Sequence, residues 1–310
     1  MCLFPRLLRN KRYLPTKKNN YNPPILANPK FKYVAVGCGQ CIECRKQIAR
    51  GWLTRMLEEA RTQRYRVFCT FSFSPQALND LVIKYTIQDV NDVATKAMRL
   101  FLERYRKKHK KSIKHWFITE LGHTNTERIH LHGILFSKEP IDTETITKLW
   151  AYGNTYIGDY CNEKTINYIV KYMLKVDEDH KGYMPKILCS KGIGANYVNS
   201  HNGENNQFKG KTTKETYTLP NGQVTNLPIY YRNKIYTEDE RQQLWEYKLD
   251  KHEIYVLGQK YNISNDKGRK IYEKVLKNAQ IHNRELGYGD LSEQWNKKQY
   301  KVTLEMLNKS

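Results

Sequence analysis

Residues 115–136 read HWFITELGHTNTERIHLHGILF and predict the centre of a β-sheet. Two runs of β-forming residues, HWFITEL and IHLHGILF, flank a polar connection, which is typical of two antiparallel strands joined by a turn. His130 and His132 are two positions apart on the second run, so their side chains project from the same face. Pairing across the turn could bring Glu120 to that face as well. We therefore expect two imidazoles and one carboxylate to converge.

The segments around this stretch predict the rest of the core. Residues 67–73 (VFCTFSF) alternate as a strand does, and residues 90–107 carry apolar side chains at helical spacing. Further helices are expected over residues 43–64, 143–150 and 165–175. The order strand, helix, two strands, helix predicts an α+β fold with a central antiparallel sheet flanked by helices.

We expect four segments along the chain. Residues 1–66 form an N-terminal arm, irregular up to residue 37 because of its prolines, with a cysteine cluster and a basic helix after it. Residues 67–180 form the core, and residues 181–236, rich in glycine and asparagine, form a loop-rich or β insertion. Residues 237–310 form a C-terminal helical appendage that begins at a capping box, Thr237 to Glu240.

The predicted cluster of Glu120, His130 and His132 has the chemistry of a metal site. A mixed nitrogen and oxygen donor set with open positions accommodates Mg²⁺ or Mn²⁺ during phosphate chemistry, although geometry alone does not exclude Zn²⁺. The alternative is that the two strand histidines are merely hydrogen-bonded. His123, in the turn after Glu120, either approaches the metal or is simply exposed.

A second group of candidate residues lies on the helix predicted over residues 165–175. Tyr168 and Tyr172 are four positions apart and therefore share one face of that helix. Lys171 lies between them and Lys175 follows, so cations are available to hold a phosphate or to lower a tyrosine pKa. A tyrosine pair at this spacing is by itself more often packing than chemistry. It gains weight from the histidines that precede it.

The charge of the chain predicts a polyanionic partner. Lys and Arg number 53 against 31 Asp and Glu, which gives a net charge of +22, and there are 23 tyrosines whose rings could stack on single-stranded bases. The alternative is a solvated basic surface. The densest basic run is residues 104–114, RYRKKHKKSIK. Its predicted DNA-binding residues, together with Lys175, are Arg104, Arg106, Lys107, Lys108, Lys110 and Lys111.

Membrane association is not expected from the sequence. No run approaches the roughly 20 apolar residues that a membrane-spanning helix needs. The N-terminal residues also lack the long apolar run and small-residue cleavage site of a signal peptide. We therefore expect the protein in the cytoplasm.

Three of the seven cysteines, Cys38, Cys41 and Cys44, form two overlapping Cys-x-x-Cys steps. A zinc site would need a fourth ligand from elsewhere. Candidates for it are Cys69, Cys161, Cys189 or a histidine. The alternative is reduced thiols in a packed turn, and the sequence leaves both interpretations open.

Four motifs occur in an order that resembles a known family. They are CGQCIECRK (38–46), FITELG (117–122), RIHLHGILF (128–136) and NYIVKYMLK (167–175). The chain resembles the replication initiators of microvirus-family phages, especially the gokushovirus-like branch, which belong to the HUH endonuclease superfamily. The bulky hydrophobe between the two histidines of that superfamily is Leu131 here.

The resemblance implies a ferredoxin- or RRM-like core and a DNA-nicking activity. His130, His132 and Glu120 would hold Mg²⁺ or Mn²⁺, and Tyr168 or Tyr172, helped by Lys171, would attack the scissile phosphate. The products would be a 5′-phosphotyrosine and a free 3′-hydroxyl. The substrate would be single-stranded or supercoiled replicative-form origin DNA in the cytoplasm of the bacterial host, with a host helicase and DNA polymerase as partners.

Two other functions are compatible with parts of this pattern. One is a non-catalytic basic nucleic-acid-binding protein with a structural zinc site, which the composition permits. The other is a transposase or plasmid relaxase of the same superfamily, which would use the same residues for a different biological purpose.

Overall fold

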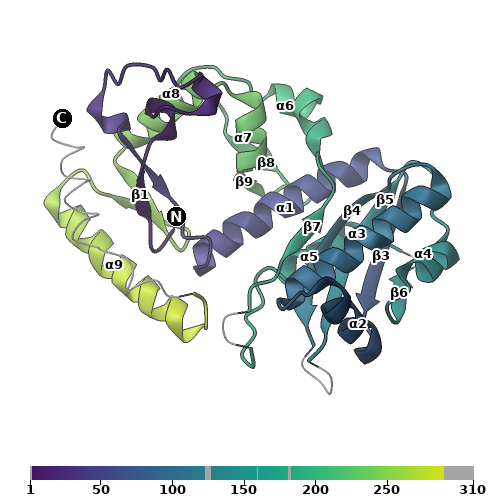
Figure 1. Cartoon of the computed structure of the whole chain (residues 1–310). Coiled ribbons are helices and arrows are strands. Elements are labelled where there is room, and N and C mark those ends of the chain that lie inside the picture. Colours follow the sequence, from purple (N-terminus) through teal and green to yellow (C-terminus); the bar gives the residue numbers. More distant parts are fainter. Residues whose placement is uncertain (1, 123–126, 159, 181–182, 290–310) are drawn as a thin grey trace. The chain divides into compact units, whose positions relative to one another are not determined.

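The computed structural model describes residues 2–122, 127–158, 160–180 and 183–289 (Figure 1). These residues form two compact units. One comprises Ile48–Trp245, and the other comprises the described residues up to Gln47 and from Glu246 onward. Helix α1 (Ile42–Thr62) begins in the second of these units and ends in the first.

The larger unit is built on a five-stranded sheet with the order β6-β3-β5-β4-β7, in which all neighbours are antiparallel. The predicted α+β class with a central antiparallel sheet is thereby confirmed. The two edge strands were not predicted, because strands of four and three residues carry too little alternation to recognise. The strands are β3 (Tyr65–Ser72), β4 (Lys114–Leu121), β5 (Ile129–Ser137), β6 (Thr155–Gly158) and β7 (Ile187–Cys189).

Helices cover both faces of this sheet. Leu131 and Leu135 of β5 point into a core made with α2 (Pro75–Tyr85), α3 (Val90–His109) and α4 (Thr143–Trp150). Ile134 and Phe136 point the other way, into a second core made with α1 and α5 (Glu163–Lys171). Because side chains alternate along a strand, each face of β5 supports a separate apolar layer.

Local signals set the helix boundaries. Helix α2 was not predicted, although Ser74 caps it by accepting from the backbone of Ala77 and Pro75 occupies its first turn. Helix α5 begins and ends earlier than predicted. Asn162 is its N-cap and forms a capping box with Thr165, and residues 172–174 are a turn beyond its end.

The predicted insertion over residues 181–236 contains short elements, and the capping box that follows it is present. Thr237 N donates to Glu240 Oε2 at 2.7 Å, and Glu240 N donates to Thr237 Oγ1 at 3.2 Å. Helix α8 (Glu238–Asp250) starts there. The elements before it are β7, a 3-10 helix (Ala195–Asn199), α6 (His201–Glu204), β8 (Thr216–Thr218), β9 (Val224–Asn226) and α7 (Ile229–Ile235).

The smaller unit contains two antiparallel strand pairs and one long helix. Strand β1 (Arg6–Arg9) pairs with β2 (Tyr33–Val36), so the prediction of an irregular arm up to residue 37 is wrong at both of its ends. The prolines that suggested irregularity lie outside the two strands. Strands β10 (Glu253–Val256) and β11 (Gln259–Asn262) also pair, and α9 (Asp266–Glu285) follows. The remaining elements are 3-10 helices at Lys11–Tyr13, Lys17–Asn19 and Pro29–Phe31.

Across the residues that the structure describes, no helix combines the length and apolar character needed to cross a membrane.

Candidate active site

Polar side chains form two successive rows on one face of the central sheet. In one row, His132 of β5 is paired with Thr70 of β3. In the next row, His130 is paired with Glu120 of β4 and with Ser72 of β3. This is the face on which Ile134 and Phe136 are buried under α1 and α5. The polar rows therefore continue the same sheet surface beyond its apolar part.

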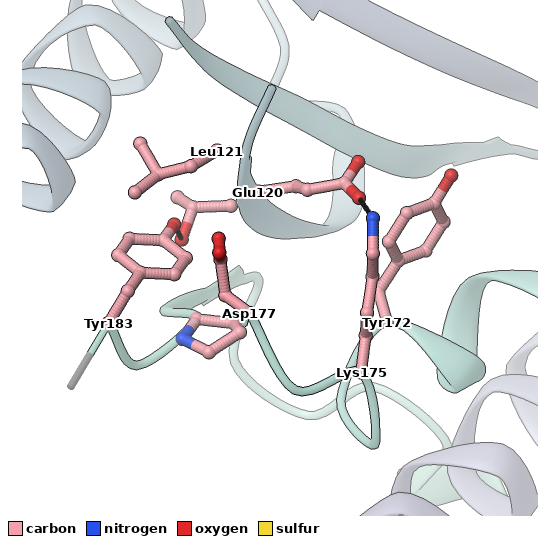
Figure 2. A pocket seen from close by; sticks show the side chains of 8 residues that line it. Glu120, Leu121, Tyr172, Lys175, Asp177 and Tyr183 are labelled. Atoms are coloured by element: carbon pink, nitrogen blue, oxygen red, sulfur yellow. Dashed lines mark hydrogen bonds and ion pairs between the residues drawn. The ribbon is translucent and has the colours of Figure 1, made fainter. Parts of the chain in front are cut away.

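His132 and Glu120 are in direct contact. His132 Nε2 lies 2.8 Å from Glu120 Oε2, and His132 Nδ1 lies 3.0 Å from the hydroxyl of Thr70. The other oxygen of Glu120 accepts from the ammonium of Lys175, which reaches it from beyond the end of α5 (Figure 2). Both site side chains are mostly buried, with 13% of His132 and 17% of Glu120 exposed. The contact is therefore partly shielded from water.

The pKa values of this cluster favour a neutral imidazole beside an ionised carboxylate. Burial lowers the pKa of His130, and the neighbouring His132 lowers it further. Burial alone would raise the pKa of Glu120, but hydrogen bonds from His132 and Lys175 hold it below its usual value. Metal ions bind neutral imidazoles and ionised carboxylates. The chemistry of the donor set therefore fits a divalent ion, although the rings of His130 and His132 are 6.4 Å apart between centroids.

The two candidate tyrosines lie next to this cluster. Their hydroxyl oxygens are 2.8 Å apart, and the ring of Tyr172 stacks on that of His132 with 4.6 Å between centroids and 8° between planes. Tyr168 is 52% exposed. Burial, the hydrogen bond with Tyr168 and the charge of Glu120 raise the pKa of Tyr172 well above its usual value. The structure thus brings both phenols, His132 and Glu120 into one site.

The candidate lysines are placed differently from one another. Lys175, which the sequence predicts to contact DNA, forms an ion pair with Glu120. Lys171 is exposed beside Tyr172, and no hydrogen bond or ion pair joins its side chain to the described residues of the site. His123 lies outside the described residues.

The basic run on α3 is distant from the tyrosines. Helix α3 covers the opposite face of the sheet, and β4 begins at Lys114 and reaches Glu120 only about 20 Å further on, at about 3.4 Å per residue. Arg104 donates to the backbone oxygens of Leu149 and Trp150 and to the hydroxyl of Tyr152. Lys108 donates to Thr145, and Lys111 pairs with Glu139. The exposed residues of the run without such bonds are Arg106, Lys107 and Lys110.

Several residues at the site were not predicted from the sequence. Thr70 could have been found, since it alternates with Phe68 and Ser72 on a predicted strand and needed only a partner strand to place it. Asp177 and Tyr183 line a pocket together with Glu120, Tyr172 and Lys175 (Figure 2). They lie beyond the last predicted helix of the core, in a segment without periodicity, so nothing in the local pattern points to them.

Comparisons with known proteins agree with the place of this site. Residues 67–177 match a family model described as a replication-associated protein of the ORF2 type. This range contains Thr70, Glu120, both histidines and both tyrosines. Residues 67–177 are a replication-associated domain.

The similarity extends beyond the replication-associated domain. The chain is 24% identical over 222 residues to the replication-associated protein VP4 of Bdellovibrio phage phiMH2K, which covers 64% of this chain and 67% of that protein. No solved structure matches the chain. The similarity to phage replication proteins predicted from the four motifs is confirmed.

Proposed function

We propose that this chain initiates rolling-circle replication of a phage genome by nicking and rejoining single-stranded DNA as an HUH-type endonuclease. One observation carries the proposal: two phenol oxygens 2.8 Å apart lie beside a histidine that contacts a carboxylate. A purely structural tyrosine pair would not need His132 and Glu120 at its side, both on a sheet surface that supplies no apolar packing there. The replication-associated domain supports the same role.

Glu120, His130 and His132 would hold a divalent ion, Mg²⁺ or Mn²⁺. When bound, such an ion supplies Lewis acidity to the scissile phosphate, which is worth several kcal/mol in the transition state. Thr70 positions His132, because its hydroxyl either donates to or accepts from Nδ1 and so suits either tautomer. Lys175 neutralises part of the charge of Glu120 and is available to a phosphate oxygen when Glu120 turns to the ion.

The chemical step uses a tyrosine as nucleophile. A phenol oxygen attacks phosphorus, its proton passes to water, and a new phosphorus–oxygen bond forms as the bond to the 3′-oxygen breaks. The 3′-oxygen takes a proton and becomes a free 3′-hydroxyl, while the DNA 5′ end stays on the enzyme as a phosphotyrosine. Because the bond energy is kept in this ester, the reverse attack by a 3′-hydroxyl rejoins the strand without ATP.

Two adjacent tyrosines allow two successive cuts at one site. Tyr168 and Tyr172 share a hydrogen bond, so one phosphate position is within reach of both hydroxyls. One tyrosine holds the first DNA end while the other cuts the regenerated origin. We propose that Lys171, exposed between them, contacts the phosphate backbone and favours the phenolate in the attacking geometry.

Aromatic side chains beside the site suit a single strand. Tyr156 of β6 is 62% exposed, and both it and Tyr168 contact the ring of Phe68, at 6.2 and 6.5 Å between centroids. Exposed rings offer faces for bases to stack on, worth about 1–3 kcal/mol per base. We propose that unpaired bases next to the cleaved phosphate stack here, on single-stranded or supercoiled replicative-form origin DNA.

The proposal also names host partners. The sequence contains no Gly-x-x-x-x-Gly-Lys-Ser/Thr loop of a nucleotide-hydrolysing motor. A host helicase would therefore open the duplex, and a host DNA polymerase would extend the free 3′-hydroxyl, in the cytoplasm of the bacterial host.

Covalent adduct formation tests this function. With a single-stranded origin oligonucleotide and Mn²⁺, we expect a protein–DNA band that survives denaturation and that EDTA prevents. Replacement of both Tyr168 and Tyr172 by phenylalanine should abolish the band while DNA affinity stays nearly unchanged, since each ring keeps its stacking face. Tyr156→Phe is the matched control, and it should still form the adduct.

The rival functions give different results. A non-catalytic nucleic-acid-binding protein would bind the oligonucleotide but give no denaturation-resistant band with any metal. A transposase or relaxase would form the band on its own recognition sequence and not on a phage origin. Either result would contradict the proposed role.

A further inference from the structure

Four cysteine side chains converge in the smaller unit. Cys2 meets Cys38 and Cys41, which precede α1, and Cys44 in the first turn of α1. Their sulfur atoms all lie within 4.8 Å of one another, and all four are free thiols. The sequence left the fourth ligand open among Cys69, Cys161, Cys189 and the histidines. The structure identifies Cys2 instead, which no spacing pattern could have linked to the other three across the intervening residues.

The distances between these sulfurs match four ligands around one ion. Cys38 and Cys44 are 3.9 Å apart between sulfurs, and so are Cys2 and Cys41. A tetrahedral zinc ion with zinc–sulfur bonds of about 2.3 Å places its sulfur ligands about 3.8 Å apart. A disulfide would need about 2.05 Å. The sulfurs therefore have the spacing of a tetrahedral tetrathiolate site.

The backbone around the cluster is arranged to stabilise negative charge on sulfur. Cys38 Sγ accepts from the backbone nitrogens of Gln40 and Cys41, at 3.4 and 3.3 Å. Cys2 Sγ accepts from the nitrogens of Phe4 and Cys38, at 3.3 and 3.2 Å. Leu3 N lies 3.5 Å from Cys41 Sγ. Donors of this kind orient and stabilise the thiolates of metal sites.

Local conformation explains how the chain makes this cluster. Gly39 has a φ of +80°, in the left-handed region that glycine adopts without strain, and this lets the chain turn between Cys38 and Cys41. Helix α1 starts at Ile42, so the positive end of its dipole lies at Cys41 and Cys44. The partial charge there offsets some of the negative charge of four thiolates.

We infer that Cys2, Cys38, Cys41 and Cys44 bind one structural zinc ion. Four sulfur ligands fill a tetrahedral shell and leave no open position for substrate, which distinguishes this site from the mixed donor set at His132. The four thiols border an apolar cluster that includes Val256, Leu276 and Ala279 from the far end of the chain. The ion therefore fastens the first residues to the start of α1 within the smaller unit.

Metal analysis of the purified full-length chain tests this inference. We expect about one zinc per chain, retained by the control variant Cys189→Ser, whose cysteine is exposed on β7, and also by His132→Ala. Cys2→Ser and Cys41→Ser should each lose that zinc. A wild-type chain without zinc after expression in zinc-supplemented medium would overturn the inference, and so would iron in place of zinc or full zinc retention by both serine variants.

A second measurement on the unmodified chain covers the case in which the serine variants do not fold. Mass spectrometry after alkylation should find Cys2, Cys38, Cys41 and Cys44 protected, and they should become labelled once an organomercurial releases zinc. The melting temperature should fall at the same time, since the ion stabilises only the folded unit. Equal labelling of these four cysteines before and after release would contradict the site.

Discussion

His132 lies at the centre of the candidate active site because its two ring nitrogens have different partners. Nδ1 faces the hydroxyl of Thr70, and Nε2 faces Glu120. A metal ion at Nε2 requires the ring proton on Nδ1, where the Thr70 hydroxyl accepts it. Thr70 is thus a positioning residue for the tautomer that binds metal.

Removal of that hydroxyl should weaken metal binding. Thr70→Val keeps the side-chain shape but removes the partner of Nδ1, and we expect Mn²⁺ affinity to fall about 10- to 100-fold, the usual cost of losing such an outer contact. Calorimetric titration with Mn²⁺ measures it. The control is Thr155→Val on β6, whose hydroxyl donates to Thr147 away from the histidines. Equal Mn²⁺ affinity in the two variants would contradict the positioning role.

A different histidine, His115, makes stability depend on pH. Burial lowers its pKa, partly offset by the hydrogen bond to the backbone of Ile113. The unfolded chain therefore takes up a proton near pH 6.5, where the folded chain does not, so the free energy of unfolding is highest above about pH 6.5 and falls as the pH drops below it. Urea unfolding between pH 7.5 and about pH 5 should show a shallower pH dependence for His115→Asn than for wild type. Parallel curves would exclude His115 as a contributor.

At the scale of secondary structure, the close pairing of β4 and β5 fixes the histidine row. Gly133 follows His132 on β5 and is paired with Phe117. A Cβ atom at Gly133 would lie 2.3 Å from the Phe117 ring and 2.4 Å from the backbone oxygen of Trp116. The aromatic ring thus occupies the space that a side chain would need, and the backbone oxygen cannot move without shifting the strand.

Gly133→Ala should therefore be strongly destabilising. We expect a loss of about 3 kcal/mol in the free energy of unfolding, at the upper end of the usual cost of overpacking a core. Gly158→Ala on the edge strand β6 is the matched control, because its Cβ would meet Phe68 only at 3.7 Å, an ordinary contact. Chemical denaturation of both variants measures the difference. A similar stability for the two would show that β4 and β5 separate more easily than this register implies.

The elements also show how far the sequence could predict the structure. The strands β3, β4 and β5, the helix α3 and the capped α4 were predicted to within a few residues, because each has clear periodicity. The convergence of Glu120 with His132 followed from alternation alone. Thr70 and Asp177 depended on which strands and loops become neighbours, and Cys2 on a contact far along the chain, so no local pattern could reveal them.

At the scale of the whole molecule, the net charge of +22 has to be distributed over a long strand. The exposed residues Arg106, Lys107 and Lys110 on α3 are about 20 Å along the sheet from Glu120, too far to contact the cleaved phosphate. Their role in this account is to hold DNA flanking the cut, through its phosphates and without sequence preference.

Neutralising these three residues should separate affinity from cleavage. We expect the triple alanine variant to bind long single strands more weakly and to reduce the slope of log affinity against log salt by about 2, since each phosphate contact contributes about 0.7. The cleavage rate at saturating DNA should change little. Fluorescence anisotropy across a salt series and single-turnover cleavage measure the two effects. An unchanged salt slope would place the DNA on another surface.

The central claim is that Tyr168 and Tyr172 are nucleophiles, and peptide mapping of the covalent adduct tests it most directly. After cleavage of a labelled origin oligonucleotide with Mn²⁺, nuclease and protease digestion should leave a nucleotide joined through its 5′-phosphate to Tyr168 or Tyr172. With either tyrosine replaced by phenylalanine, the label should move to the other. A nucleotide attached to a different residue, or joined through a 3′-phosphate, would contradict the account.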